Sequence, residues 1–282
     1  MPSYSTHEMK TILLHDHILS AIVPRPIALV STVDLDGNDN LSPFSFYNAF
    51  GSNPSTLIFS PARRVRDNTI KHTLKNVIAT RECVINAVTY TIVEQTSLSS
   101  VEYPAEISEF IKAGFTPIPS IKVAPKRVAE SPVQFECKVR DIIATGDQGG
   151  AGNLVICEIL MMHIHDDVLD EKGRIDQHKL DIVGRLGGDY YCRASGDALF
   201  TINKPNEKLS IGIDQLPINI RNSNKLTGYE LAQLASVEAI PERDMNTIIT
   251  STQDEIYIIV KKLLSENQIA LAWQYLLQNN ER

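Results

Sequence analysis

The chain has 282 residues, a formal net charge of −7, and 43% hydrophobic and 22% charged residues, which is typical of a globular protein long enough to bury a full core. The negative charge argues against a protein that mainly neutralises nucleic-acid phosphates, and no apolar run approaches the roughly 18 residues of a membrane-spanning helix. The sequence therefore predicts no nucleic-acid and no membrane partner. An N-terminus without a basic stretch followed by an apolar run predicts a cytoplasmic protein.

Strand-like segments dominate the first part of the chain. They lie at residues 26–33, 41–47, 56–59 and 83–88. Residues 34–40, which include Gly37, read as a hairpin connection between the first two strands. Apolar residues at i, i+4, i+7 and i+8 predict a helix from Asn68 to Thr80.

The next part continues with a helical stretch, a loop and a hairpin. Residues 91–115 read as helical, and Gly114 suits a helix end. A covering loop follows, with prolines at positions 117, 119, 125 and 132. Clean alternation over residues 133–140 predicts a half-buried antiparallel strand. Its partner, residues 154–164, is apolar on both sides, which fits a barrel wall covered on the outside by a second subunit.

The character of the sequence changes after about residue 195. Helical spacing recurs at residues 225–237, 242–249, 253–264 and 267–278. The sequence thus predicts an antiparallel barrel with inserted helices over residues 1–195 and a helical C-terminal extension over residues 196–282. The four cysteines include no Cys-x-x-Cys pair, so they are expected to pack as small hydrophobic residues.

One candidate site would bind a single phosphate. Lys71 offers a point charge and Thr73 a hydroxyl near the start of a predicted helix, where backbone N–H groups and the helix dipole favour anions. Ser60 and Arg63 end the preceding strand and could reach the same anion. The alternative is that the basic residues here form only a solvated face.

A second candidate site would bind a planar heterocycle. Strict alternation would place Ser42, Phe44, Phe46 and Asn48 on one side of the returning strand and Pro43, Ser45 and Tyr47 on the other. A proline inside a strand argues for an edge or a bulge, where backbone groups are free to face a ligand. The alternative is an ordinary edge strand with an aromatic core side.

Other motifs are weaker. His163 and His165 would point to one side of a strand, but no third ligand is evident, so no metal site is predicted. The segment from Gly146 to Gly152 lacks the Gly-Lys-Ser/Thr of a phosphate loop and joins two strands, which indicates a hairpin turn. No Gly-x-Gly-x-x-Gly opens a βαβ unit, which disfavours a Rossmann fold.

Five ordered segments resemble the flavin reductase-like, FMN-binding split-barrel family of the flavoredoxin type. They are Arg25-Pro-Ile-Ala-Leu-Val-Ser-Thr, Asn40-Leu-Ser-Pro-Phe-Ser-Phe-Tyr-Asn, Lys71-His-Thr-Leu-Lys-Asn, Glu130-Ser-Pro-Val-Gln-Phe-Glu-Cys and Arg185-Leu-Gly-Gly-Asp-Tyr-Tyr. The resemblance covers about residues 10–195. It departs from the family pattern at one place, where the usual Lys-Asp-Thr reads Lys71-His72-Thr73.

The resemblance implies a six-stranded antiparallel Greek-key split barrel that forms a homodimer, with FMN near the dimer interface. It implies contacts of the flavin ring and ribityl chain with the strand that carries Ser42, Phe44, Ser45 and Asn48. It implies phosphate contacts from Ser60, Arg63, Lys71 and Thr73, with further contacts from Arg25 and Tyr190. No protein acid or base is required, so no catalytic residue is assigned.

The function that follows is an FMN-dependent oxidoreductase that takes hydride from NADH or NADPH and passes electrons to an acceptor. One alternative is an FMN-binding electron carrier that has no nicotinamide site and is reduced by a partner protein. Another is a β-barrel interaction module whose helical extension binds a partner.

Overall fold

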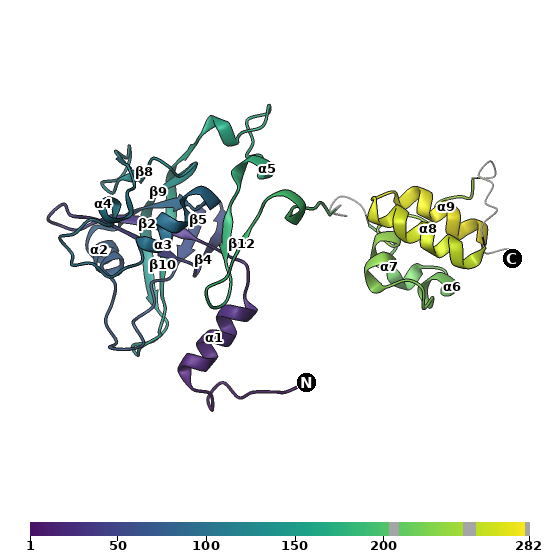
Figure 1. The fold of residues 1–282 in the computed structure, drawn as a ribbon, viewed down its shortest axis with the longest axis horizontal. Coiled ribbons are helices and arrows are strands. Elements are labelled where there is room, and N and C mark those ends of the chain that lie inside the picture. The colour runs from purple at the N-terminus through teal and green to yellow at the C-terminus, as the bar shows by residue number, and fades with distance from the viewer. Residues whose placement is uncertain (203–208, 245–251, 280–282) are drawn as a thin grey trace. The chain divides into compact units, whose positions relative to one another are not determined.

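The computed structural model describes residues 1–202, 209–244 and 252–279. The chain divides into two compact units, residues 1–200 and 201–282. The first is mainly β and the second is helical (Figure 1). The sequence predicted a boundary at residue 195, which is five residues before the observed end of the first unit. These five residues include a short 3₁₀ helix, Gly196–Ala198. Among the described residues, no helix has both the length and the hydropathy needed to cross a membrane.

The main sheet of the first unit has seven antiparallel strands in the order β3-β2-β6-β9-β10-β5-β4. Their bounds are β2 (Ala28–Val33), β3 (Asp39–Phe44), β4 (Tyr47–Ser52), β5 (Ser55–Phe59), β6 (Glu82–Ala87), β9 (Val133–Ala144) and β10 (Asn153–Ile164). The expected number of six strands is wrong, because the single strand predicted over residues 41–47 is divided between β3 and β4. Greek-key connectivity remains a prediction.

The strand order requires the sheet to curl. β3 and β4 lie at opposite ends of the order, yet only Ser45 and Phe46 separate them in the chain. A flat sheet would place these edges about 29 Å apart, whereas the connection spans at most about 11 Å. The edges therefore meet: the rings of Phe44 and Phe59 lie 5.4 Å apart, and the Ser60 amide donates to the Phe46 carbonyl at 2.8 Å. This is a barrel whose two edge strands meet without pairing.

Strand β2 shows how the barrel wall is buried on both faces. Ala28 and Val30 point into the barrel interior, where they join a core that includes Phe59 and the buried face of α2. Leu29, which alternation places on the opposite face, joins an outer core that includes Phe110 of α4. The predicted alternation of this strand is therefore satisfied by two separate cores.

Shorter elements surround the barrel. The helices of this unit are α1 (Thr11–Ala21), α2 (His72–Thr80), α3 (Val93–Leu98), α4 (Glu109–Ala113) and α5 (Gln177–Leu180). Two small antiparallel sheets are formed by β1 (Arg25–Pro26), β11 (Val183–Arg185) and β12 (Tyr191–Arg193), and by β7 (Pro117–Ile118) with β8 (Arg127–Val128). Helix α1 extends away from the barrel and buries none of its residues (Figure 1). The helix expected over residues 91–115 is present only as α3 and α4.

Helix α2 starts four residues later than expected. Asn68 has a φ of 58°, a left-handed conformation that cannot continue a helix. Its side-chain oxygen and its carbonyl accept hydrogen bonds from Arg63, and its side-chain Nδ2 donates to the Asp147 carbonyl. The chain is therefore held in a turn until Lys71, which precedes the first helical residue.

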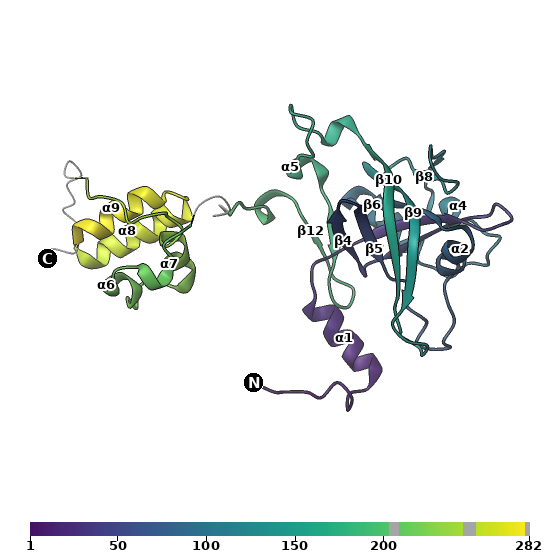
Figure 2. The same ribbon diagram turned by 180° about the vertical axis from the view of Figure 1, so that it is seen from behind.

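The long hairpin of β9 and β10 extends beyond the rest of the sheet (Figure 2). In β10, Val155 and Cys157 are buried, but the opposite face is only partly covered, and near the end of the strand Leu160 and Met162 are exposed. Within one chain the outer face of β10 is thus only partly covered, and its burial by a second subunit remains a prediction.

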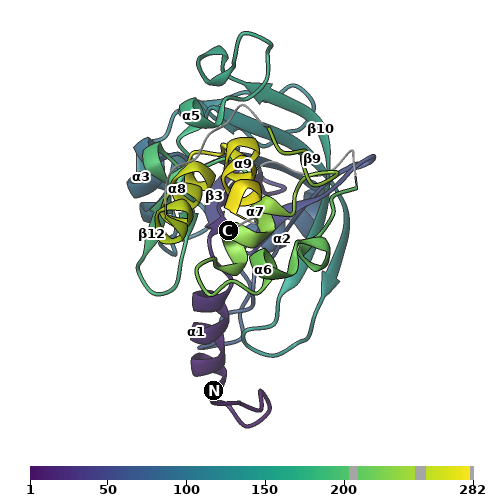
Figure 3. The ribbon, with the colours of Figure 1, turned by 90° about the vertical axis from the view of Figure 1, so that its right-hand side faces the viewer.

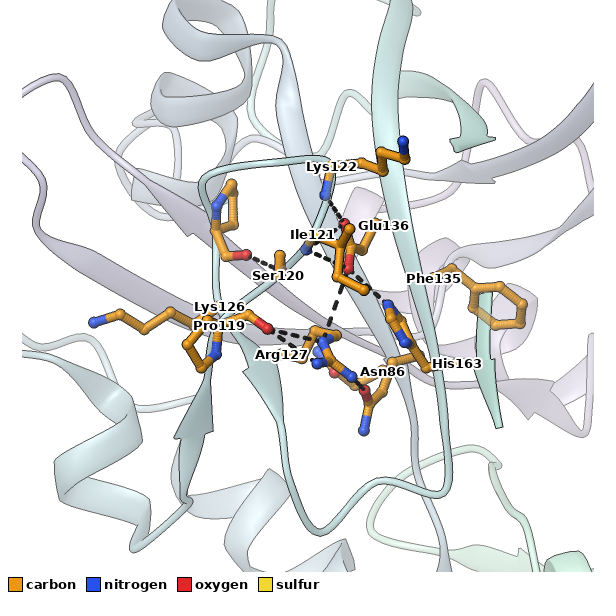
Figure 4. Close-up of polar contacts among 12 residues, drawn as sticks. Asn86, Pro119, Ser120, Ile121, Lys122, Lys126, Arg127, Phe135, Glu136 and His163 are labelled. Carbon is orange, nitrogen blue, oxygen red and sulfur yellow. Dashed lines mark hydrogen bonds and ion pairs between the residues drawn. The ribbon is translucent and has the colours of Figure 1, made fainter. Parts of the chain in front are cut away.

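The proline-rich loop between β7 and β8 is held to the barrel by a buried carboxylate. Glu136 on β9 is fully buried and accepts hydrogen bonds from the backbone amides of Ile121 and Lys122 (Figure 4). Its Oε1 also lies 2.7 Å from His163 Nε2 and 3.8 Å from Arg127 Nε. Burial raises the pKa of Glu136, but the two amides and His163 outweigh it and bring the pKa below its ordinary value.

The second unit is a helical bundle with its own core. Its helices are α6 (Ile218–Arg221), α7 (Gly228–Leu234), α8 (Gln253–Ser265) and α9 (Ile269–Asn279) (Figure 3). Trp273, the chain's single tryptophan, is fully buried and donates from Nε1 to the Leu234 carbonyl at 3.0 Å. Of the helix expected over residues 242–249, residues 245–249 lie outside the described part of the chain, and the three residues before them are not helical.

Candidate functional site

Two adjoining cavities lie beside the end of β3. The first, which we name the Lys71 pocket, has a volume of about 30 Å³ and is lined by Asn40, Ser42, Arg64, Lys71, His72, Thr73, Ser100, Val101, Glu102, Tyr103 and Glu109. The second, the Arg185 pocket, has a volume of about 210 Å³ and is lined by Ile27, Pro43, Phe44, Ser45, Thr96, Ser97, Ser100, Arg185 and Tyr191. Ser100 lines both, and residues 42–45 run from one to the other.

The start of helix α2 forms one wall of the Lys71 pocket. Lys71 occupies the position before the first helical residue, and its side chain does not cap the helix. The first backbone N–H groups of a helix have no partner within the helix, and they carry the positive end of its dipole. Because Lys71, His72 and Thr73 all line the pocket, this uncapped helix start faces a small cavity, and such helix starts favour anions.

The Lys71 ammonium is a cation without an anion. The residue is half-buried, its Nζ lies 5.4 Å from the centroid of the Phe44 ring, and no carboxylate in the described part of the chain forms an ion pair with it. Burial, and then the nearby charge of Arg64, lower the pKa of Lys71, although the charges of Glu102 and Glu109 oppose this. Burying an unpaired charge is unfavourable. Binding of an anion in the pocket would therefore offset this unfavourable free energy, which is present in the protein without ligand.

The other cations of this region are already engaged. Arg64 donates to Glu102 at 2.5 Å and to Thr69 Oγ1 at 2.9 Å. Arg63, which the sequence indicated instead, donates to Asn68 Oδ1 at 2.6 Å and does not line the pocket. A ligand anion would therefore meet Lys71 as the available charge, because Arg64, which also lines the pocket, is already paired with Glu102.

Thr73 belongs to a buried hydrogen-bond network beneath the pocket. Its hydroxyl donates to Asn40 Oδ1 at 2.8 Å, and the Asn40 Nδ2 donates to both oxygens of Glu109 at 3.1 Å. Burial raises the pKa of Glu109, although the Leu41 amide and the Asn40 side chain oppose this. Asn40 Nδ2 donates to a carboxylate, so Asn40 Oδ1 must be the atom that accepts from Thr73. The single proton of the Thr73 hydroxyl is therefore already donated within the protein and is not available to a ligand.

Replacing Thr73 with valine is therefore expected to act mainly on stability. Loss of the hydroxyl removes one hydrogen bond to a buried acceptor, which costs about 1 kcal/mol, while the loss of ligand affinity should be smaller than for a change at Lys71. Chemical denaturation measures the first effect, and calorimetric titration with FMN, the ligand that the family resemblance implies, measures the second. Thr73→Ser, which keeps the donor, is the matched control, and a larger effect of valine on affinity than on stability would contradict this assignment.

Hydroxyl groups line the Arg185 pocket from α3 and the residues that follow it. Thr96 Oγ1 is buried and has no hydrogen-bond partner among the described residues, although the residue lines the pocket. Ser97, Ser100 and Ser45 add three hydroxyls, and the Phe44 ring supplies an apolar surface. A buried hydroxyl without a protein partner usually forms a hydrogen bond with a ligand or an ordered water. Together with the apolar Phe44 ring, these hydroxyls suit a flat polar molecule.

The structure brings five of the ten predicted site residues together. Ser42, Lys71 and Thr73 line the Lys71 pocket, and Phe44 and Ser45 line the Arg185 pocket. The predicted alternation of side chains is wrong beyond Phe44, because the chain bends at residues 45 and 46. Pro43 lies on a strand at the end of the sheet order, which confirms the expected edge position.

The other five predicted residues lie outside both pockets. Arg25 is buried, donates to the carbonyls of Leu19, Ile22 and Leu186, and approaches Ser45 Oγ at 3.5 Å. Ser60, Asn48 and Tyr190 are likewise placed elsewhere: Ser60 Oγ accepts from the Asn153 amide at 3.0 Å, Asn48 accepts from its neighbour Ala49, and Tyr190 is 76% exposed. Arg63 completes this group.

Sequence reasoning missed several lining residues. They are Asn40, Arg64, Thr96, Ser97, Ser100, Glu102, Arg185 and Tyr191. Asn40 and the last two stand inside segments that carried the family resemblance, which was an available signal. Those on α3 and the segment after it had no signal, because a serine-rich stretch next to a short helix is common in any protein.

The weak His163 and His165 motif does not form a metal site among the described residues. His163 contacts the Glu136 carboxylate rather than His165. Across residues 1–202, 209–244 and 252–279, no group of three or more His, Cys, Asp or Glu side chains is arranged to hold a metal ion.

Comparison with known proteins connects this geometry to a family. Residues 19–179 match the family described as the flavin reductase like domain. An uncharacterised protein of Aquifex aeolicus (strain VF5) is 39% identical over 184 residues, which is 65% of this chain and 91% of that protein. An uncharacterised protein of Halalkalibacterium halodurans is 35% identical over 190 residues, 67% of this chain and 89% of the relative.

Solved structures share the fold of the same part of the chain. Nitrilotriacetate monooxygenase component B from Bacillus cereus superposes with a TM-score of 0.67 at 26% identity, covering 72% of this chain and 98% of that chain. The 2-nitrobenzoate 2-nitroreductase of Pseudomonas fluorescens superposes with a TM-score of 0.64 at 28% identity, covering 72% and 96%. The predicted family resemblance is thereby confirmed.

Proposed function

Because this chain belongs to the flavin reductase like domain family, we propose that it binds FMN and oxidises NADH or NADPH with it. In this proposal the FMN phosphate occupies the Lys71 pocket and the flavin ring occupies the Arg185 pocket. The ribityl chain passes Ser42 and Ser100 between them. All of these residues belong to the first unit, so residues 1–200 carry the flavin site.

The observation that carries the proposal is the Lys71 ammonium at the uncapped start of α2. A phosphate would supply the missing anion, accept hydrogen bonds from the backbone N–H groups and lie at the positive end of the helix dipole. The neighbouring pocket supports the rest of the ligand, since Thr96 Oγ1 still lacks a partner and the Phe44 ring offers an apolar surface.

A bound flavin would supply the chemistry of hydride and electron transfer. The chain's own residues bind and orient it. Lys71 neutralises charge at one end, and the residues between Ser42 and Ser45 fix the direction in which the ligand lies. No side chain is assigned the role of acid or base.

We also propose that the chain forms a homodimer. Helix α1 buries none of its residues, and Ile12 is 75% exposed within it. On the barrel, Phe50 of β4 and Met162 of β10 are exposed as well. A contiguous group of such side chains is typical of an interaction site, and a second copy of the chain would cover these residues. Size-exclusion chromatography with light scattering measures the oligomeric state directly.

The main experiment is spectroscopic. We expect the purified protein to be yellow or to bind added FMN, and the flavin absorbance to bleach when NADH or NADPH is added without oxygen. A colourless protein that fails to bind FMN would rule the proposal out. A flavin that stays oxidised with both nicotinamides, but is reduced by a protein partner, would indicate an electron carrier. Parallel titration with FAD tests the choice of flavin.

A further inference from the structure

Two arginines and a tyrosine stand in one row beside the Arg185 pocket. In the small sheet β1-β11-β12, Arg25 is paired in register with Arg185, and Arg185 with Tyr191. Residues in register on neighbouring antiparallel strands have side chains on the same face. The Arg185 guanidinium lies 4.5 Å from the centroid of the Tyr191 ring, which fixes its orientation.

The positive charge of this row is poorly compensated. Arg25 donates only to uncharged acceptors, and it is 5% exposed. Arg185 donates to the Gly188 carbonyl at 2.6 Å, and its one ion-pair partner in the described part of the chain is Asp189 at 3.9 Å, which is fully exposed. Burial, followed by the charge of Arg185, lowers the pKa of Arg25. Among the described residues, Arg25 therefore has no ion-pair partner, and Arg185 has only a long, solvated one, although the chain has a net charge of −7.

Of the two cations, Arg185 is the one that reaches the pocket. Both Arg185 and Tyr191 line it together with Pro43 and Phe44, whereas Arg25 contacts Ser45 but does not line the pocket. Since Arg25 is saturated by carbonyl groups, its charge acts over a distance, while Arg185 still has donors that are free to turn toward a ligand. The pocket thus combines a flat aromatic surface with a positive wall.

We propose that Arg185 stabilises the anionic reduced form of the flavin and thereby raises its reduction potential. This inference rests on the proposed function. When a hydride with its two electrons leaves NADH or NADPH and adds to the neutral oxidised ring, the nicotinamide becomes a cation and the flavin ring gains one negative charge. A guanidinium beside the ring attracts that charge in a partly buried site but interacts weakly with the neutral oxidised ring. The difference between the two interactions sets the potential.

The test compares the affinities of the full-length protein for oxidised and reduced FMN. Arg185→Met removes the charge and keeps much of the length. We expect it to raise the Kd for reduced FMN about tenfold more than the Kd for oxidised FMN, equivalent to a potential about 30 mV more negative. Arg185→Lys keeps a charge and should retain most of the wild-type potential. Anaerobic titrations give both constants, and equilibration with redox dyes gives the potential independently.

Arg193→Met is the matched control. The Arg193 guanidinium stacks on Tyr90 at 4.0 Å and pairs with Asp181, in the same small sheet but outside both pockets. The reduction potential of FMN bound to Arg193→Met should equal that of FMN bound to the wild type. If Arg185→Met weakens both redox states by the same factor, or changes neither, the inference is overturned while FMN binding by the wild type still stands. If the wild type binds no FMN in either state, the proposed function itself fails.

Discussion

Replacing Lys71 with alanine is expected to weaken FMN binding roughly 10- to 150-fold. A hydrogen bond to a charged group contributes about 1.5–3 kcal/mol, and Lys71 is the only lysine or arginine lining the Lys71 pocket that has no carboxylate partner within the described residues. The stability of the free protein should not fall, because the variant removes a half-buried cation that has no ion-pair partner among the described residues. Isothermal titration calorimetry measures the affinity, and thermal unfolding without ligand measures the stability.

Two controls make this prediction specific to the phosphate. Lys75 is exposed, one helical turn further along α2 and outside the pocket, so Lys75→Ala should bind FMN as the wild type does. Riboflavin has no phosphate, so its affinity should be the same for wild type and Lys71→Ala. Equal weakening of riboflavin and FMN would show that the phosphate was placed wrongly.

The lysine also predicts a pH dependence. The anion should bind the protonated ammonium, and burial lowers the pKa of free Lys71. FMN affinity should therefore fall as the pH rises through that lowered pKa, at a pH below the ordinary lysine value of about 10.4. The fall should be absent in Lys71→Ala. An alkaline decrease of the same size in both proteins would assign it to another group.

Replacing Glu136 with alanine is expected to destabilise the barrel by about 3–5 kcal/mol. The change leaves the amides of Ile121 and Lys122 without their acceptor and removes the carboxylate beside His163 and Arg127. Removing one member of a buried charged cluster usually costs this much, which is a large share of the total stability of a domain. Urea denaturation followed by far-ultraviolet circular dichroism measures the loss.

The chain provides internal controls for this experiment. Trp273 lies in the second unit, so its fluorescence follows that unit and should report an unchanged transition. Glu158→Gln removes a partly exposed ion pair with Arg140 on the same barrel and should cost no more than about 1 kcal/mol. A loss in Glu136→Ala as small as that of Glu158→Gln would show that the carboxylate does not hold the loop.

The contribution of Glu136 should depend on pH with a defined sign. Its pKa in the folded protein is lowered below the unfolded value of about 4.3. The carboxylate therefore contributes stability that is fully present above this pH and is lost as the pH falls toward the lowered folded pKa. Glu136→Gln cannot ionise and should lose less stability between pH 5 and pH 3 than the wild type does. An identical acid profile in both proteins would contradict the assignment.

Local pattern was a good guide wherever one face of a regular element decided the outcome. The strand over residues 133–140 and the helix over residues 253–264 were predicted from alternation and helical spacing, and β9 and α8 occupy these places. Prediction failed at Ser45 and Phe46, where the chain leaves one edge of the sheet and joins the other. The alternation of side chains along one strand does not indicate where the two edges of a seven-stranded sheet come together.

The site shows the same division. The types of group that gather beside α2 were visible in the sequence, because Lys71 and Thr73 are two residues apart in a segment that resembles a known family. Which charges remain available was not visible. Arg63 and Arg64 are adjacent residues of the same type. Arg63 is hydrogen-bonded to Asn68 and does not line the pocket, whereas Arg64 lines the pocket and is paired with Glu102.

By itself, the sequence determined the family, the mainly β architecture of the first unit and the presence of a lysine at a helix start, because these depend on residue type and short spacing. The tertiary structure alone decided that Thr73 donates to Asn40, that Arg185 stands beside the end of β3, and that Lys71 is left without an anion. The physical reason is that hydrogen bonds and ion pairs are shared among groups far apart in the chain. Whether a polar side chain is free to bind a ligand therefore depends on every neighbour that the fold brings to it.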